Sequence, residues 1–470
     1  MATKIDNVLA KLPEAMVTTD QDVIEGYLLD FRAKYHGVTR AVLRPKTTEE
    51  VSLCVRICRE YKVQLIPQGG NTSYCGSATP DTSGNQLLLL FERLNKIREV
   101  DVNNRSVTAE AGVVLSNLQD AAENRDLLCP LALGSHQSCQ IGGNISTNAG
   151  GVNVLRYGMS RDLVLGLEVV LPDGRILDTL SPLRKDNTGY STDQLFIGAE
   201  GTLGLVTAVS LKLERKPNQI VTAFLACSSV DDLPVLFDRI QVMTGDAVCS
   251  FEYISDHSLD LLLISKPTHR HPLETRTEHY VLVEISTSSS FLPIEDAFQE
   301  VLEDFFANGL VLDGTIAASE GQRAALWELR ESIPEGETLQ GGSVKHDIAV
   351  RRSLVPDFIT KAAAILTENG NGARLSIYGH VGDGNIHFNV LPATKNTDID
   401  AVWIDMNLSP RIYELANEMG GTFSAEYGLG QAKLDLNDTY GNPIKTDVMR
   451  QMKMTFDPEN LFNPGKVVIL

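Results

Sequence analysis

Three glycine-dense stretches in the first half of the chain constrain its fold more than any other feature. They read "PQGGNTSYCGS" at 67–77, "SCQIGGNISTNAGGVN" at 138–153 and "FIGAEGTLGLVT" at 196–207, and strand-like sequence flanks each of them. Glycine lets the backbone approach a ligand closely, and successive amide groups in a turn form a concavity that binds anions. One such stretch alone is most often a simple turn. Three in one domain favour a large cofactor that carries phosphate.

None of these stretches matches a standard nucleotide-binding motif. The pattern Gly-x-Gly-x-x-Gly does not occur in "GGNTSYCGS", and no Gly-Lys-Ser/Thr follows it. The sequence therefore argues against an NAD-binding Rossmann motif and against a P-loop.

The order of predicted elements indicates more than one domain. A chain of 470 residues is longer than one core usually organises. Thr47 and Glu50 predict a capping box at the start of an amphipathic helix, and Pro-Asp-Gly at 172–174 predicts a hairpin turn. The glycine-rich sequence stops near Arg215, and mixed strands and helices follow. We therefore predict a first domain over 1–215, a second over 216–415 and a C-terminal segment over 416–470.

Composition excludes several classes of protein. A formal net charge of −20 repels nucleic-acid phosphates and anionic membranes. No apolar run approaches the roughly 18 residues that a membrane span needs, and "MATKIDNVLAKLPEAM" lacks the apolar centre of a signal peptide, so we expect a cytoplasmic protein. The seven cysteines include no Cys-x-x-Cys pair, which favours buried thiols over disulfides or a cysteine metal site.

Taken together, the motifs carry a resemblance to a known family. "PQGGNTS", "SCQIGGNISTNAGG" and "GAEGTLGLVT", in this order and spacing, resemble the FAD-binding domain of the vanillyl-alcohol oxidase superfamily. "GHVGDGNIHFN", "SAEYGLGQAK" and "NPGKV" are similar to its D-2-hydroxyacid dehydrogenase branch. The resemblance implies an α+β fold, in which a two-part FAD-binding domain is joined by a cap domain with an antiparallel sheet. It also implies a C-terminal segment that returns to the flavin.

The same resemblance implies the chemistry. A D-2-hydroxy acid would be oxidised to the 2-oxo acid, with the hydride passing to N5 of a non-covalently bound FAD and the electrons then passing to a carrier. A homodimer is common in the family. The residues that the resemblance implies at the cofactor are Pro67, Gln68, Gly69, Gly70, Asn71, Thr72, Ser73, Gly76, Ser138, Gly142, Thr147, Asn148, Gly150, Glu200, Gly201, Gly204 and Val206.

A candidate metal site lies in "RLSIYGHVGDGNIHFNV". Two strand-like runs flank "VGDGN", so His380 and His387 are expected across a hairpin at roughly 5 to 8 Å from each other. From spacing alone, two hydrogen-bonded histidines beside a turn are the simpler interpretation. The resemblance adds Glu426 as a third ligand, and a His/His/carboxylate set suits zinc ahead of manganese or iron.

Basic and amide side chains are expected to hold the substrate. The resemblance implies that Arg330 and Lys345 bind its carboxylate, although each would otherwise be assigned to a charged surface. Asn389, two residues after His387, can donate a hydrogen bond to the same carboxylate.

The chain departs from the family at the expected general base. Where the family motif usually reads Glu-His-Gly, this sequence reads Glu426, Tyr427 and Gly428. Tyrosine is a poor base at pH 7 because its ordinary pKa is near 10. His346 is a possible substitute, though a lone histidine is more often structural. Two alternatives therefore stay open, namely a family enzyme for a different hydroxy acid or alcohol, and a catalytically silent flavin-binding subunit.

Overall fold

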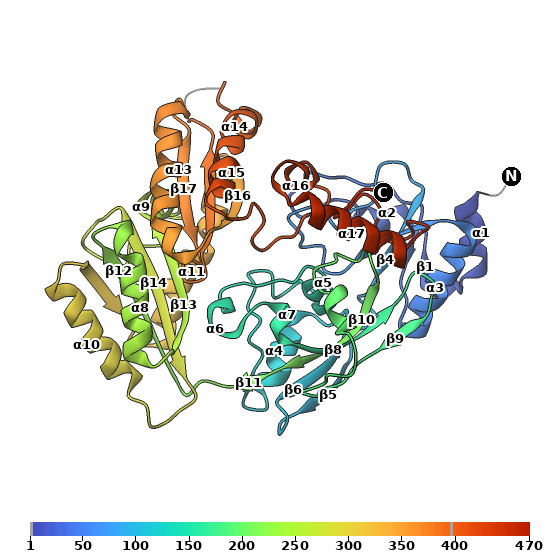
Figure 1. Ribbon diagram of the computed structural model, residues 1–470, viewed down its shortest axis with the longest axis horizontal. Coiled ribbons are helices and arrows are strands. Elements are labelled where there is room, and N and C mark those ends of the chain that lie inside the picture. Colours follow the sequence, from blue (N-terminus) through green and yellow to red (C-terminus); the bar gives the residue numbers. More distant parts are fainter. Residues whose placement is uncertain (1–2, 395–397) are drawn as a thin grey trace. The chain divides into compact units, whose positions relative to one another are not determined.

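The computed structural model describes residues 3–394 and 398–470, and the chain divides into two compact units (Figure 1). The first unit runs to Gly151 and includes 157–216 and 426–470, whereas the second comprises 152–156 and 217–425. The division after Lys216 lies one residue from the expected boundary. The C-terminal segment joins the first unit from Glu426 onward, ten residues later than expected. The sequence carries no signal for the short excursion at 152–156.

A four-stranded sheet opens the first unit, in the order β1 (Val17–Thr18), β2 (Val42–Leu43), β4 (Gln86–Leu90) and β3 (Gln64–Gln68). β4 pairs in parallel with both neighbours and is buried along its whole length, which its sequence QLLLL predicts. Helix α3 (Thr48–Tyr61) packs its apolar face on this core. As predicted, Thr47 caps α3 by accepting from the amide of Glu50, but the Glu50 carboxylate bonds the amide of Lys46 instead of closing the capping box.

The second sheet of this unit is antiparallel and five-stranded, in the order β5 (Ile97–Asp101), β6 (Ser106–Glu110), β10 (Leu205–Lys212), β8 (Val164–Val170) and β9 (Ile176–Asp178). β8 and β9 form the hairpin predicted from the Pro-Asp-Gly turn, with Val170 opposite Ile176. The remaining elements of the first unit are α1 (Lys4–Lys11), α2 (Gln21–Glu25), α4 (Leu115–Glu123), β7 (Leu127–Leu128), α5 (Ile141–Ser146), α7 (Ser160–Leu163) and β11 (Glu214–Arg215).

The C-terminal segment belongs to the same unit through specific contacts. It contains α16 (Leu434–Tyr440) and α17 (Pro443–Phe456). The buried Lys453 on α17 donates to the backbone oxygens of Thr202 and Phe462 and to Asp457. Phe462 forms a parallel bridge with Leu65 of β3. The last residues of the chain therefore help to complete the core of the first sheet.

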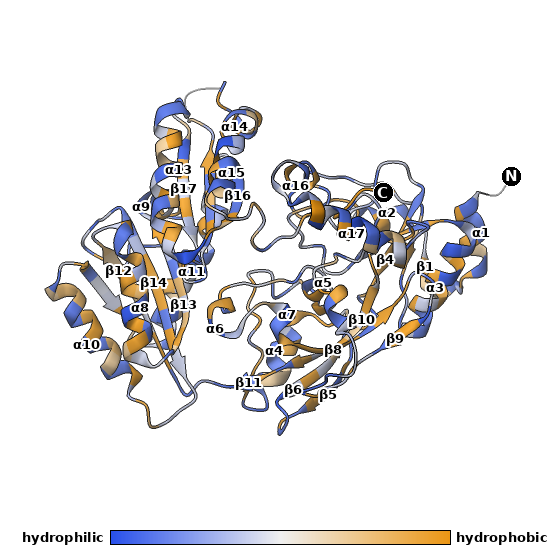
Figure 2. Ribbon diagram, viewed as in Figure 1, coloured by the Kyte–Doolittle hydropathy of each residue, from blue (hydrophilic) through white to orange (hydrophobic). Residues whose placement is uncertain are grey.

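The second unit is built on one seven-stranded antiparallel sheet, as predicted for the cap domain. Its strands follow the order β15 (Val311–Ile316), β12 (Gln219–Cys227), β14 (His279–Thr287), β13 (Val248–Ser255), β17 (Arg374–Gly379), β18 (Asn385–Leu391) and β16 (Val344–Ala349). Figure 2 shows β13 and β14 as largely hydrophobic, in keeping with a sheet that is covered on both faces.

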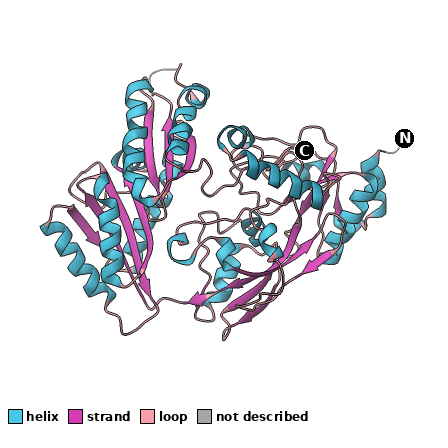
Figure 3. Cartoon of the chain, viewed as in Figure 1, coloured by secondary structure: helices cyan, strands magenta, loops and turns pink. Residues whose placement is uncertain are grey.

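Helices cover both faces of this sheet (Figure 3). One face packs on α9 (Asp256–Ser265), α11 (Glu320–Glu331) and α12 (Ile333–Leu339), whose apolar side chains share a core with β12, β13 and β14. On the other face lie α8 (Leu233–Thr244), α10 (Ile294–Ala307), α13 (Val355–Asn369), α14 (Ala401–Asn407) and α15 (Ser409–Glu418). The short helix α6 (Val154–Tyr157) begins within the 152–156 segment of this unit.

Across the residues that the structure describes, no helix combines the length and apolarity needed to cross a membrane.

Candidate active site

The three glycine-dense stretches come together in the first unit. A methyl group added at Gly70 would lie 2.1 Å from the carbonyl oxygen of Ser138, so the first and second stretches are in direct backbone contact. Gly201 has a φ of +69°, and a methyl group there would lie 2.5 Å from Cγ of Pro67. Stretches that are far apart in the sequence therefore form one surface, which is what a single large cofactor requires.

The first stretch has the geometry of an anion-binding loop. Asn71 has a φ of +52°, and its side-chain amide holds the turn by donating to the carbonyl of Leu29. Within the part of the chain that the structure describes, the backbone amides of 70–73 donate to no protein acceptor. Oε1 of Gln140 is buried without a partner beside Gly69. Unpaired amides and an unpaired acceptor in one place fit the pyrophosphate and the hydrogen-bond donors of FAD.

Several residues expected at the cofactor have packing roles in the structure. Gly142 lies against Ala111, and Gly204 lies against Phe196. Val206 is buried in the core between the second sheet and its helices. Among the polar residues, the Asn148 side chain accepts from the amide of Arg161, whereas the hydroxyls of Thr147 and Ser138 bond nearby backbone oxygens.

Glu200 was also expected at the cofactor, but its side chain binds within the protein. Its carboxylate accepts from the amides of Leu429 and Gly430 at 2.7 and 3.0 Å and from the hydroxyl of Ser77. Burial raises the pKa of Glu200, although these donors favour the charged form. The carboxylate therefore anchors the loop that follows Tyr427 to the first unit. The ring of Tyr427 itself packs on that of Tyr74.

In the second unit the predicted hairpin brings the two histidines together. His380 directly follows β17 and His387 lies on β18, with their ring centroids 5.3 Å apart and the ring planes nearly perpendicular. Nδ1 of His380 lies 2.7 Å from Oε1 of Glu252, which projects from the neighbouring strand β13. This carboxylate–imidazole pair is the arrangement that orients metal-bound histidines in proteins.

Glu426 follows directly on Ala425, whose amide is bonded to the Asp347 side chain on β16. His380 and His387 each offer one ligand atom in the second unit, and Glu426 is the carboxylate that the resemblance adds to them. Two imidazoles and a carboxylate suit a divalent ion such as zinc. Since Glu252 engages Nδ1 of His380, Nε2 is the nitrogen that would bind it. The residues present thus fit a metal.

The three predicted substrate contacts lie in the second unit, each against a buried carboxylate or aromatic ring. Arg330 is buried, pairs with Glu252 at 2.9 Å and lies over the ring of Tyr378. Lys345 lies opposite Asn389 in the pairing of β16 with β18, and both side chains donate to Glu337. Oδ1 of Asn389 is buried without a partner.

The structure corrects the expectation that His346 can replace the missing base. His346 is fully buried, and its ring nitrogens lie 2.7 Å from the carbonyl of Phe388 and 2.8 Å from the hydroxyl of Ser409. Neighbouring residues of a strand point to opposite faces, so His346 faces away from the side on which Lys345 lies. The ring packs on Tyr413 and has a structural role.

Glu252, Glu337 and Tyr378 are site residues that sequence reasoning missed. One signal was present, because Glu252 is a charged residue inside the otherwise apolar and hydroxyl-bearing strand "VCSFEYIS". A carboxylate in such a strand has to be paired when buried. Glu337 lies in a short helix with ordinary helical sequence and carries no comparable signal.

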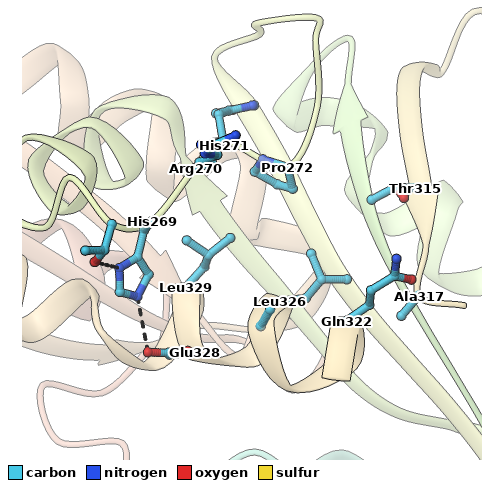
Figure 4. Close-up of a pocket in the computed structure, with 12 residues that line it drawn as sticks. His269, Arg270, His271, Pro272, Thr315, Ala317, Gln322, Leu326, Glu328 and Leu329 are labelled. Atoms are coloured by element: carbon cyan, nitrogen blue, oxygen red, sulfur yellow. Dashed lines mark hydrogen bonds and ion pairs between the residues drawn. The ribbon is translucent and has the colours of Figure 1, made fainter. Parts of the chain in front are cut away.

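A separate pocket of about 540 Å³ lies in the second unit beside α11 (Figure 4). Its lining combines the imidazoles of His269 and His271 with Gln322 and the apolar side chains of Leu326 and Leu329. None of the predicted metal or substrate residues lines it.

The comparisons with known proteins extend over both units. The FAD binding domain family matches residues 39–180, and the family of C-terminal domains of FAD linked oxidases matches 216–467. The chain is 38% identical over 460 residues to the mitochondrial D-2-hydroxyglutarate dehydrogenase of Danio rerio, covering 98% of this chain and 84% of the relative. It is 34% identical over 467 residues to the D-2-hydroxyglutarate dehydrogenase of Stutzerimonas stutzeri, covering 98% of each.

Two further similarities are to a yeast protein and to a solved structure. The D-2-hydroxyglutarate–pyruvate transhydrogenase of Saccharomyces cerevisiae is 33% identical over 475 residues, covering 98% of this chain and 92% of the relative. The solved structure of p-cresol methylhydroxylase with substrate bound superimposes with a TM-score of 0.76 at 17% identity, covering 99% of this chain and 96% of that one. At that identity the likeness speaks for the fold alone.

Proposed function

Because the chain belongs to the FAD-linked oxidase family, in its D-2-hydroxyacid dehydrogenase branch, we propose that it oxidises D-2-hydroxyglutarate to the 2-oxo acid. The names of relatives from vertebrates, bacteria and yeast support this substrate. Bound FAD supplies the hydride acceptor at its N5 atom. The electrons then pass to a carrier, and the yeast relative's name makes a second 2-oxo acid the alternative acceptor.

The proposal includes a divalent metal, zinc first, at His380, His387 and Glu426. The single observation that carries it is the 2.7 Å contact of His380 with Glu252, because a buried carboxylate behind an imidazole fixes the tautomer that binds a metal through the other nitrogen. A divalent ion held by these residues would lower the pKa of a substrate hydroxyl bound to it and so would ease loss of the hydroxyl proton.

Arg330 and Lys345 would hold the substrate's carboxylates. The amide nitrogen of Asn389 donates to Glu337 and to the hydroxyl of Tyr378, so Asn389 would instead accept from a substrate hydroxyl through Oδ1. Arginine can offer two parallel donors, and lysine offers a point charge. Each cation already has a buried carboxylate partner, which fixes the direction in which its remaining donors point. D-2-hydroxyglutarate has two carboxylates, and this pair of cations suits a dicarboxylate better than a monocarboxylate such as lactate.

Tyr427 takes the position of the family's histidine, and we assign its phenol a hydrogen bond to the substrate's hydroxyl or to a relay water. The hydroxyl proton would leave to solvent through that relay water, and no base is needed at Tyr427 because a bound metal would lower the hydroxyl's pKa. The substitution also favours a second candidate function, in which the same flavin and metal chemistry acts on another hydroxy acid whose shape suits a tyrosine.

Anaerobic mixing of the purified flavoprotein with single acids tests the proposal. D-2-hydroxyglutarate should bleach the flavin absorbance, L-2-hydroxyglutarate should not, and D-lactate should react more slowly. Faster bleaching by another D-2-hydroxy acid would favour the second candidate. Failure of every acid, with FAD and metal bound, would favour the silent flavin-binding subunit.

Two further expectations stay predictions, namely a homodimer and a location in the cytoplasm. The names of several relatives include the word mitochondrial, and that word describes the location of those relatives alone.

A further inference from the structure

Two buried carboxylates contact the predicted metal and substrate residues of the second unit. Glu252 and Glu337 are 1% and 0% exposed. A buried carboxylate is stable only when charged or polar partners compensate its lost hydration. Each of these has such partners, and in both cases the partners are residues of the candidate site.

The two carboxylate oxygens of Glu252 contact residues with different predicted functions, one a metal ligand and the other a substrate cation. Oε1 contacts Nδ1 of His380 at 2.7 Å, and Oε2 accepts from Nε of Arg330 at 2.9 Å. Glu252 therefore contacts one predicted metal ligand and one predicted substrate cation at the same time.

Glu337 makes the corresponding contacts with the other pair. Oε2 accepts from Nζ of Lys345 at 2.6 Å, and Oε1 accepts from the side-chain amide of Asn389 at 2.9 Å. The hydroxyl of Ser343 adds a third donor at 2.8 Å. Fixing the amide of Asn389 in this way makes its unpaired Oδ1 an acceptor that points in one direction.

We propose that Glu252 and Glu337 are positioning residues with separate roles. Glu252 holds His380 in the tautomer that ligates metal and at the same time aims Arg330, whereas Glu337 holds Lys345 and Asn389 for the substrate and has no part in metal binding. This inference rests on the proposed function. Neither carboxylate is assigned to contact the substrate or the metal itself.

Glu252→Gln and Glu337→Gln form a matched pair, because both remove one buried negative charge without changing side-chain volume. The measurement is the affinity of the metal-stripped flavoprotein for Zn²⁺, determined by competition with a chromophoric chelator. Glu252→Gln should weaken Zn²⁺ binding about 10- to 100-fold, the usual effect of losing a carboxylate behind a metal-bound histidine. Glu337→Gln should leave the affinity within about twofold and raise KM for D-2-hydroxyglutarate roughly tenfold, as expected for loss of one charged hydrogen bond.

Unchanged Zn²⁺ affinity in Glu252→Gln would overturn the inference, and so would equal weakening in both variants. If Glu252→Gln does not fold, Glu252→Asp takes its place, because it keeps the charge but withdraws the carboxylate from Nδ1 of His380, and wild-type affinity in that variant would be equally decisive. A wild-type protein that binds no Zn²⁺ in the same titration would contradict the proposed metal site instead.

Discussion

The ring of Tyr427 packs on the ring of Tyr74, with the two centroids 4.6 Å apart and the planes tilted by 46°. Tyr74 follows directly on the anion-binding loop, so the residue that replaces the family's histidine is packed against a neighbour of that loop. This contact restricts the Tyr427 ring without using its hydroxyl. A substitution that keeps the ring and removes only the hydroxyl should therefore leave this ring contact in place.

Tyr427→Phe keeps the ring and removes only the hydroxyl. We expect flavin reduction at pH 7 to slow about 10- to 100-fold, because one hydrogen bond near a developing charge is lost. The wild-type rate should rise toward alkaline pH. Anaerobic stopped-flow spectroscopy of both proteins measures this, and complete loss of reduction with FAD and metal bound would make Tyr427 the essential base.

Chelation, or His380→Ala, should abolish reduction of the flavin by substrate while FAD stays bound, since the candidate metal ligands and the anion-binding loop are different residues. Flavin absorbance and metal content are measured on the same sample. His36→Ala is the control, because His36 is an exposed histidine that pairs with Glu25. A protein shown to be free of metal that still bleaches at the normal rate would remove the metal from catalysis.

Local signals in the sequence predicted the hairpin well. "VGDGN" between two strand-like runs predicts that His380 and His387 approach each other, and the turn places them as expected. The side to which each residue points was also predictable from the sequence. Alternation along a strand requires that neighbouring residues such as Lys345 and His346 face opposite sides, and this rule alone excludes His346 from the side on which Lys345 lies.

The partners of these residues could not be predicted, because they depend on sheet order. Glu252 meets His380 only because β13 pairs with β17, although more than a hundred residues separate the two strands in the sequence. The same holds for Glu200, whose motif predicted a cofactor contact but whose side chain meets Leu429 and Gly430 after the chain returns to the first unit. Contacts between distant segments leave no local pattern.

Glu200→Gln should destabilise the first unit by about 1–3 kcal/mol, because an acceptor of two backbone amides becomes in part a donor that faces them. Urea unfolding of the variant and the wild type measures the difference. Glu99→Gln on β5 serves as the control for losing an exposed negative charge. Equal stability of Glu200→Gln and wild type would show that this carboxylate does not anchor the loop after Tyr427.

Lys466 gives a prediction about pH, because its ammonium group is buried. Burial lowers its pKa to about 8, although Asp81 and Glu200 act to raise it. A lysine whose pKa is lower in the folded than in the unfolded state disfavours folding below pH 8, and this cost disappears as pH rises from about 8 to 10.5.

Lys466→Met should therefore stabilise the FAD-free protein at pH 7 by at most about 3 kcal/mol, and the gain should shrink by pH 9.5, where the wild-type amine is largely neutral. Urea unfolding of both FAD-free proteins at the two pH values measures it. A gain of the same size at both pH values would mean that the methionine packs better and that the charge is irrelevant. With FAD bound, the gain at pH 7 should disappear, because the negative charge of a cofactor close to Lys466 would compensate the ammonium group.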